Sequence, residues 1–487
     1  MPKTQRGGRK VISVVPLLLV ISIAAPLLLG VFAFTRRKAF EVAVAGSLVA
    51  LAGVVCNAAL YLSSQMRPSQ YVLAYYNGLA LGFVNDSLSV LVSLMVALNG
   101  LATIVFSKHY MSPSNREHPV SLEETPRYYG WLLLFEASAL GFVYSSTLLS
   151  MVAFFELTSL CSYALISYYE DPESRRSGLQ AFIVTHIAAL GLYLAAGLTY
   201  ASTGSVEVVA LKGMPEELKT IAELLLLVAA AGKSAQIPFH RWLPDAMVAP
   251  TPVSAYLHAA AMVKLGAYLM LRVLVDAGYT HTVALACLAV GVVSMAYGCA
   301  MYFPQLDMKR LLAYSTITQL SYIFMGAGLA SLGSAMALKG AELHIFTHGF
   351  AKELFFLVAG LISFSAGTRM LDKISGLRAA RTAAVGFTVA ALSVTGVPPF
   401  GLFWSKILLI LGGYSAGSIV AAIIATAMLC ESIVCFAWFL RVFTKCVGGE
   451  PSDAVKSMQR EPTTMKMTVY FLALMSLLAP FLATPFL

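Results

Sequence analysis

Apolar runs long enough to cross a lipid bilayer constrain this chain more than any other feature. The longest runs interrupted only by isolated charges cover residues 11–34, 42–63, 88–106, 131–168 and 467–487. About 20 apolar residues are enough to span the hydrocarbon core. Composition agrees, because 59% of the residues are hydrophobic and 12% are charged, against about 25% charged in soluble globular chains. The sequence therefore predicts an all-α integral membrane protein.

The spacing of polar loops predicts about fourteen transmembrane helices. They are expected at residues 12–35, 40–64, 80–107, 129–147, 149–168, 178–201, 217–237, 252–274, 281–303, 310–331, 335–364, 382–412, 415–444 and 465–486. The first apolar run is too long for the core of a signal peptide, so we expect a retained helix. The polar stretches between the helices are too short to hold a soluble domain.

Two of these spans carry helix breakers at the depth of the bilayer. Residues 232–238 (GKSAQIP) end helix seven, and residues 395–401 (TGVPPFG) interrupt helix twelve. Proline removes an amide donor and frees carbonyl groups that lipid cannot satisfy. Interrupted spans at matching places indicate inverted repeats, although two ordinary proline kinks are the alternative. The predicted parts are helices 1–3 at 1–128, a first five-helix repeat at 129–274, a second at 281–445, and helix 14 at 446–487.

Four ionisable residues lie inside apolar spans, where a leucine would serve packing better. They are Glu156, Lys233, Lys264 and Lys406. Each costs at least about 2.5–3.5 kcal/mol to insert at the centre of a membrane helix. Four such residues are hard to explain by snorkelling near an interface, so they are candidate carriers of protons or other ions.

Helix eleven carries a polar stripe, because His344, His348 and Lys352 follow one another at i, i+4 and i+8. Two histidines at this spacing also suit a metal ion, but no carboxylate or cysteine completes the set and a cationic lysine continues it. His258 and His186 fit a structural role and a proton-carrying role equally well. The seven cysteines lack metal-ligand spacing, and we expect no metal and no cofactor.

The formal charge of +9 is spread over short loops, which suits membrane orientation rather than nucleic-acid binding. Loops after odd-numbered helices hold most of the lysines and arginines, including Arg175, Arg176 and Arg241. The positive-inside rule places these loops in the cytoplasm and both termini outside, although the basic N-terminus (Lys3, Arg6, Arg9, Lys10) argues the other way. A multi-pass protein of a prokaryotic plasma membrane is expected.

Four blocks of sequence carry a family resemblance. They are residues 231–247 with 250–259 (AGKSAQIPFHRWLPDAM and PTPVSAYLHA), 307–316 (DMKRLLAYST), 348–352 (HGFAK) and 396–406 (GVPPFGLFWSK). Together they resemble the antiporter-like subunits shared by respiratory complex I, energy-converting membrane hydrogenases and Mrp sodium/proton antiporters. The resemblance runs from about residue 85 to 441. Residues 182–187 (FIVTHI) depart from the pattern of many complex I members, which favours a hydrogenase-like or Mrp-type assembly.

The resemblance implies a fourteen-helix fold with two inverted five-helix repeats. It also implies roles: Glu156 and Lys233 as a pair on helices five and seven, Lys264 as the connecting lysine, and Lys406 as the exit residue. His258, His344, His348 and Lys352 would fill the chain between them. The lateral-helix extension of the largest complex I pump subunit is not expected here. Implied partners are other membrane subunits of a respiratory or antiporter complex, including homologous antiporter-like subunits, together with the lipid bilayer.

The function predicted from these residues is translocation of protons, with sodium/proton antiport as a variant of it. We found no flavin, quinone or cluster motif, so any redox chemistry is expected in partner subunits. Two other classes stay open: a structural membrane subunit that has the fold but does not conduct, and a freestanding secondary transporter.

Overall fold

The computed structural model describes residues 14–77 and 79–487. The basic N-terminus and the first two residues of the expected helix 12–35 lie outside the described residues. Within the described part, ten segments are long and apolar enough to cross a membrane. They are α1 (Val14–Ala33), α2 (Ala39–Ser63), α3 (Ser87–Tyr110), α5 (Leu148–Ile166), α6 (Pro172–Thr203), α9 to α10 (Thr251–Ala277), α11 (His281–Ala300), α13 (Ala335–Ala366), α16 (Ile419–Val447) and α18 with η5 (Thr463–Phe486).

Further helices fill the remaining expected positions. They are α4 (Thr125–Tyr144), α7 (Glu216–Lys233), α12 (Met308–Ser331) and the consecutive pair α14 (Arg381–Thr395) and α15 (Gly401–Ser415). Short elements lie in the connections: η1 (Val208–Gly213), α8 (Trp242–Asp245), η2 (Ala246–Val248), η4 (Leu377–Ala379) and α17 (Asp453–Lys456). The chain is thus an all-α membrane protein apart from one hairpin.

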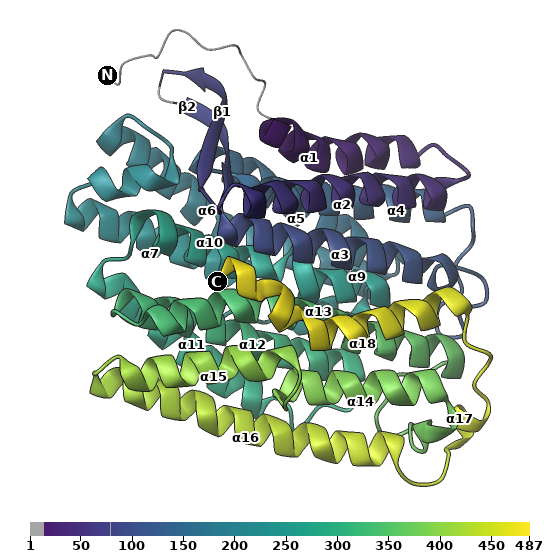
Figure 1. The fold of residues 1–487 in the computed structure, drawn as a ribbon. Helices are drawn as coiled ribbons and strands as arrows, with labels where there is room; N and C mark the ends of the chain where they lie inside the picture. Colours follow the sequence, from purple (N-terminus) through teal and green to yellow (C-terminus); the bar gives the residue numbers. More distant parts are fainter. Residues whose placement is uncertain (1–13, 78) are drawn as a thin grey trace.

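The helices lie side by side, with α1 at one edge of the molecule and α16 at the opposite edge (Figure 1). The interior consists of α3, the α9–α10 segment and α13, whose side chains are largely buried. By contrast, α1, α6 and α16 expose rows of large apolar side chains. This arrangement suits a bilayer, where apolar side chains face lipid and polar ones gather inside the bundle.

Both predicted helix breaks are confirmed. The first break ends α7 at Lys233, and the freed carbonyl of Gly232 accepts a hydrogen bond from the Trp242 indole at 3.0 Å. The second separates α14 from α15 at Gly396, whose φ of +81° suits glycine. Broken backbone persists at membrane depth only where protein or water satisfies it. The first break is buried from Gly232 to Gln236, whereas Pro398 and Pro399 of the second are exposed.

The expected helix at 80–107 is wrong at its start, because a β-hairpin precedes α3. Strands β1 (Ser69–Tyr76) and β2 (Leu79–Asn85) pair antiparallel. The missed signal is the alternation of Leu79, Leu81 and Phe83 after an Asn-Gly dipeptide, which is typical of hairpins. β2 and α3 follow each other in one apolar stretch, so the hydrophobic pattern alone did not separate the strand from the helix. Asp86 then caps α3 by accepting from the Ser89 amide at 2.9 Å.

Two isolated β-bridges occur at corresponding places in the two predicted repeats. Thr147, the N-cap of α5, forms a bridge with Glu207 beyond the end of α6. Asp307, the N-cap of α12, forms a bridge with Met370 beyond the end of α13. In the predicted repeats these are the second and third helices of each half, and the breaks fall in the fourth.

A buried cluster of three charged residues (Arg272, Asp86 and Asp276) connects the start of α3 to α10. Arg272 is fully buried and donates to Asp86 at 2.5 and 2.8 Å and to Asp276 at 3.1 Å. Removing one partner of a buried pair leaves an uncompensated charge.

We therefore expect Arg272→Met to lower the free energy of unfolding by about 3–5 kcal/mol. The exposed pair of Lys456 and Asp453, 3.9 Å apart, supplies the control. Lys456→Met should change the free energy of unfolding by no more than about 1 kcal/mol. Thermal unfolding of the detergent-solubilised protein measures both, and equal effects would contradict the structural role of the buried cluster.

Candidate functional site

The closest contact between two predicted site residues joins Lys264 and His348. Lys264 Nζ lies 2.5 Å from His348 Nδ1, and both side chains are fully buried. Lys264 follows a π-helical turn, η3 (Leu257–Ala261), that separates α9 (Thr251–Tyr256) from α10 (Val263–Ala277). At this separation one nitrogen must donate and the other accept, so a single proton shared by the pair can move between them.

The polar contacts continue from His348 along α13. The rings of His348 and His344 stack with centroids 5.7 Å apart, and His344 stacks on Tyr322 of α12 at 5.4 Å. His344 Nδ1 also lies 2.9 Å from the Ser405 hydroxyl, one residue before Lys406. Because Ser405 donates to the Leu402 carbonyl at 3.2 Å, this histidine nitrogen is the donor.

Lys406 ends this series beside Glu431 of α16. Its Nζ lies 3.7 Å from Glu431 Oε2 and 5.1 Å from the centre of the Tyr322 ring. Tyr322 donates to Glu431 at 2.6 Å, and Tyr302 donates to it at 3.2 Å. Lys406 is only 3% exposed, so its expected position inside the bundle is confirmed. The candidate residues chosen from the sequence do not include Glu431, although a lone carboxylate in an apolar run is a signal for it.

His258 and Lys352 form a side group next to this series. His258 Nδ1 lies 3.0 Å from the Thr316 hydroxyl, which donates to the Leu312 carbonyl at 2.9 Å. Lys352 donates to the same carbonyl at 3.1 Å. The Leu312 carbonyl of α12 thus accepts hydrogen bonds from both Thr316 and Lys352. The side chains of His258 and Lys352 are fully buried.

Lys233 and Glu156 each have another direct partner, and their expected pairing stays a prediction. Lys233 donates to the Phe155 carbonyl at 2.8 Å and to Ser159 at 2.7 Å. Glu156 instead lies 3.0 Å from His186 Nδ1 on α6. Among the described residues, no ion pair within 4.0 Å joins the two. The reason is helical geometry: Phe155 and Ser159 share one face of α5, and Glu156 is turned about 100° from Phe155 toward α6.

The structure therefore brings part of the predicted set of site residues together. Lys264, His348, His344 and Lys406 form one contact series, and His258 and Lys352 lie beside it. The helices that carry Lys233 and Lys264 pack closely on each other, since a Cβ on Gly266 of α10 would meet the Ala230 carbonyl of α7 at 2.3 Å. The Nε2 atoms of His258, His344 and His348 are buried and have no protein hydrogen-bond partner in the described part of the chain. Buried polar atoms without a protein partner are commonly hydrogen-bonded to ordered water.

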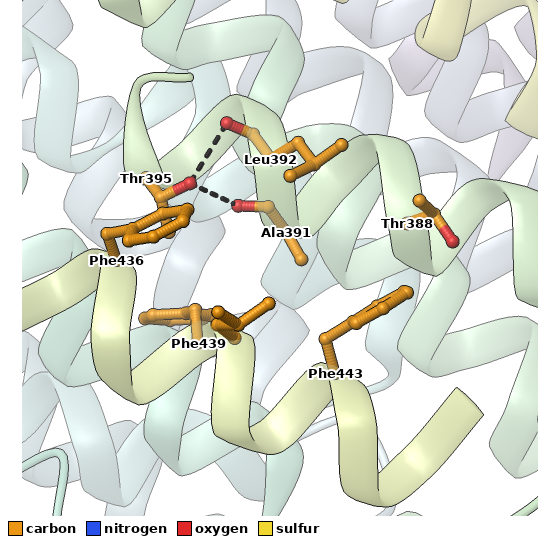
Figure 2. Close-up of a pocket in the computed structure, with 8 residues that line it drawn as sticks. Thr388, Ala391, Leu392, Thr395, Phe436, Phe439 and Phe443 are labelled. Atoms are coloured by element: carbon orange, nitrogen blue, oxygen red, sulfur yellow. Dashed lines mark hydrogen bonds between the residues drawn. The ribbon is translucent and has the colours of Figure 1, made fainter. Parts of the chain in front are cut away.

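A separate apolar pocket of about 100 Å³ lies between α14 and α16. Figure 2 shows Phe436, Phe439 and Phe443 of α16 facing Thr388 and Ala391 of α14. Thr395 turns its hydroxyl away to the Ala391 and Leu392 carbonyls, at 2.9 and 3.0 Å. The pocket has no charged lining residue, so it is not part of the polar series.

The Lys406–Glu431 pair can be tested by a double-mutant cycle. Glu431→Leu alone leaves a buried cation without its carboxylate and should cost about 3–5 kcal/mol of stability. Lys406→Met alone should cost a similar amount. The double variant should recover most of the loss, because well-packed apolar residues can replace a buried pair. Thermal unfolding measures all three, and simply additive losses would contradict the pairing.

Comparison with known proteins places these features in a family. The model of the family described as "NADH:quinone oxidoreductase/Mrp antiporter, TM" matches residues 145–431. The "Putative antiporter subunit mnhA2" of Staphylococcus haemolyticus (strain JCSC1435) is 36% identical over 344 residues, which are 67% of this chain and 42% of that protein. The protein of the same name in Staphylococcus saprophyticus is 35% identical, covering 74% of this chain and 48% of its own length. The chain thus spans less than half the length of these curated relatives.

Two solved structures are similar to the whole chain. A chain of the Mrp complex from Dietzia sp. DQ12-45-1b superposes with a TM-score of 0.82 at 27% identity, covering 96% of this chain and 50% of that one. A chain of the membrane-bound sulfane sulfur reductase, an archaeal respiratory membrane complex, gives a TM-score of 0.82 at 22% identity, covering 96% and 77%. The second likeness shows the fold alone. The family match covers most of the chain, including both breaks and the buried lysines, and the chain belongs to the NADH:quinone oxidoreductase/Mrp antiporter membrane-subunit family.

Proposed function

We propose that this chain translocates protons across a membrane as one subunit of a larger complex. The observation that carries the proposal is the buried contact series from Lys264 through His348 and His344 to Lys406 and Glu431. Packing alone does not require such groups in the interior, and intramembrane ionisable residues commonly mark ion pathways. Sodium/proton antiport is a variant in which Na⁺ moves against the proton.

The proton transfer starts at the Lys264–His348 contact. A proton on Lys264 Nζ passes to His348 Nδ1, and the lysine becomes a neutral amine. The imidazolium then passes its Nε2 proton through water to the Nε2 of His344, which is unpartnered among the described residues, since the stacked rings make no direct hydrogen bond. The positive charge arriving on His344 repels the Lys406 ammonium, and Lys406 releases a proton toward the exit. The extra proton on His344 then passes through water to Lys406, which returns the histidine to its neutral form and the lysine to its charged form. Each step moves one proton between nitrogen and oxygen atoms and forms no new covalent intermediate.

The depth of these groups keeps the transfers inexpensive in the membrane field. Lys264 is the midpoint of the span Thr251–Ala277, and His348 lies near the middle of Ala335–Ala366. Moving an elementary charge across 100 mV costs about 2.3 kcal/mol. Transfers between groups at similar depth do little work against that field, so only uptake and release cross the potential.

We assign proton uptake to the region of Lys233, Glu156 and His186. Lys233 is fully buried, whereas the side chains of Glu156 and His186 are 20% and 45% exposed. A partly exposed carboxylate beside a histidine can collect a proton at the margin of the bundle. Rotation of Glu156 toward Lys233 would then pass it inward, and His258 with Lys352 would buffer the charge on the line.

Two inverted five-helix repeats, at residues 129–274 and 281–445, are part of the proposal. The matching bridges at Thr147–Glu207 and Asp307–Met370 support them, as do the breaks after Lys233 and at Gly396. Helices 1–3 (1–128) and helix 14 (446–487) would flank them. Two halves of opposite orientation supply one half-channel to each side of the membrane.

The relatives of the chain suggest its partner subunits, and its charged loops suggest its orientation in the membrane. A relative is named as an antiporter subunit and a similar chain belongs to an Mrp complex, so we propose membrane partners that include homologous subunits. Basic loops after the odd-numbered helices would lie in the cytoplasm of a prokaryotic cell, and both termini outside. The alternatives are a non-conducting structural subunit and a freestanding transporter, and the variants below separate them.

The first variant is Lys264→Ala, with Lys339→Ala as its control because that lysine is exposed on α13. Loss of a group that transfers protons lowers rates by about 10²–10⁴-fold. We expect Lys264→Ala and His348→Ala to reduce proton transport by about 100-fold, measured as pH-gradient formation in membrane vesicles with the assembled complex. Transport unchanged in both variants would exclude this line as the path.

The second variant is Lys233→Ala, which distinguishes a conductor from a scaffold. A conductor loses ion transport while the complex stays assembled, as checked by native gel electrophoresis of the membranes. A scaffold keeps its transport rate. Uptake by the chain expressed alone, if found, would favour the freestanding transporter.

A further inference from the structure

Two buried carboxyl groups outside the proposed line flank α3. Glu136 of α4 and Glu353 of α13 are both fully buried. Glu136 Oε1 accepts from Ser47 of α2 at 2.9 Å, and Glu353 Oε1 accepts from Thr103 of α3. The second oxygen of each carboxyl group has no hydrogen-bond partner in the described part of the chain. The family blocks in the sequence include neither residue.

Both groups converge on the same turn of α3. The Glu136 carboxyl lies against Gly100, where an added Cβ would meet its carbon and one of its oxygens at 2.8 Å. Thr103, the partner of Glu353, is three residues further along that helix. Asn99 lies next to Gly100 and on the same face as Thr103. Its amide is fully buried, and neither its nitrogen nor its oxygen has a partner among the described residues.

Glu353 faces away from the lysine that precedes it. Lys352 donates to the Leu312 carbonyl of α12, whereas Glu353 accepts from Thr103 of α3. Among the described residues, neither Glu136 nor Glu353 has a cation within 4.0 Å. An isolated ionised carboxylate in such surroundings is costly, and a carboxyl group there takes up a proton instead.

We propose that Glu136 and Glu353 form a second proton-binding site, in which two neutral carboxylic acids on either side of α3 hold protons. The site is separate from the Lys264–His348 line. The ligand is H⁺. The oxygen-rich surroundings make a sodium ion the competing occupant.

Infrared spectroscopy of the full chain in its membrane tests the proposal. The C=O stretch of a carboxylic acid is distinct from the bands of a carboxylate. Difference spectra of Glu136→Gln and Glu353→Gln should each lose one acid band, whereas Glu217→Gln, an exposed residue on α7, should lose carboxylate bands. Loss of carboxylate bands in the first two variants would overturn the proposal, as would loss of the acid bands on adding Na⁺ to the wild type.

If a glutamine variant does not fold, dicyclohexylcarbodiimide, which reacts with protonated buried carboxyl groups, replaces it. Modification of Glu136 and Glu353 would support the site, and modification of the partly exposed Glu156 alone would overturn it. These readouts report protonation, so they can fail while Lys264→Ala still abolishes transport.

Discussion

The hydrocarbon interior of a membrane supplies no water to backbone or charged groups, and the rest of the structure depends on that constraint. Every broken turn and every ionisable side chain at this depth must find a partner inside the protein. The break after Lys233 meets this demand through the Trp242 indole on the Gly232 carbonyl. The break at Gly396 lies between α14 and α15, beside the buried Lys406.

The same constraint gathers the polar side chains on the interior helices. α13 bears His344, His348 and Lys352 toward α10 and α12, and Glu353 toward α3. Each group is held by a short contact to a neighbouring helix rather than by solvent. Proton transfer needs donors and acceptors held in place at hydrogen-bond distance, and close helix packing provides that. The fold that buries these groups therefore also holds them in the fixed positions that the proposed proton transfer needs.

The two ends of the series differ in their exposure. Lys406 and Glu431 are almost fully buried, and two tyrosine hydroxyls hold the carboxylate. Glu156 and His186 are partly exposed on α5 and α6. A buried end needs rearrangement or water before it can release a proton, whereas an exposed end inside a membrane span can meet lipid or a neighbouring subunit. This asymmetry agrees with uptake at one margin of the bundle and a gated exit at the other.

The sequence by itself determined the membrane class, the positions of the helices and both breaks, because apolar length and proline chemistry are local properties. It also identified the lysines and histidines, since a charge in an apolar run is conspicuous. Only the tertiary structure decided their partners. The β-hairpin before α3 was missed because an apolar strand and an apolar helix look alike. The tertiary structure gave Glu156 a direct contact with His186 and Lys233 a direct contact with Ser159, because neighbouring residues on α5 point to different helices. The roles of Glu431, Glu136 and Glu353 depend on side chains distant in sequence, which only packing brings together.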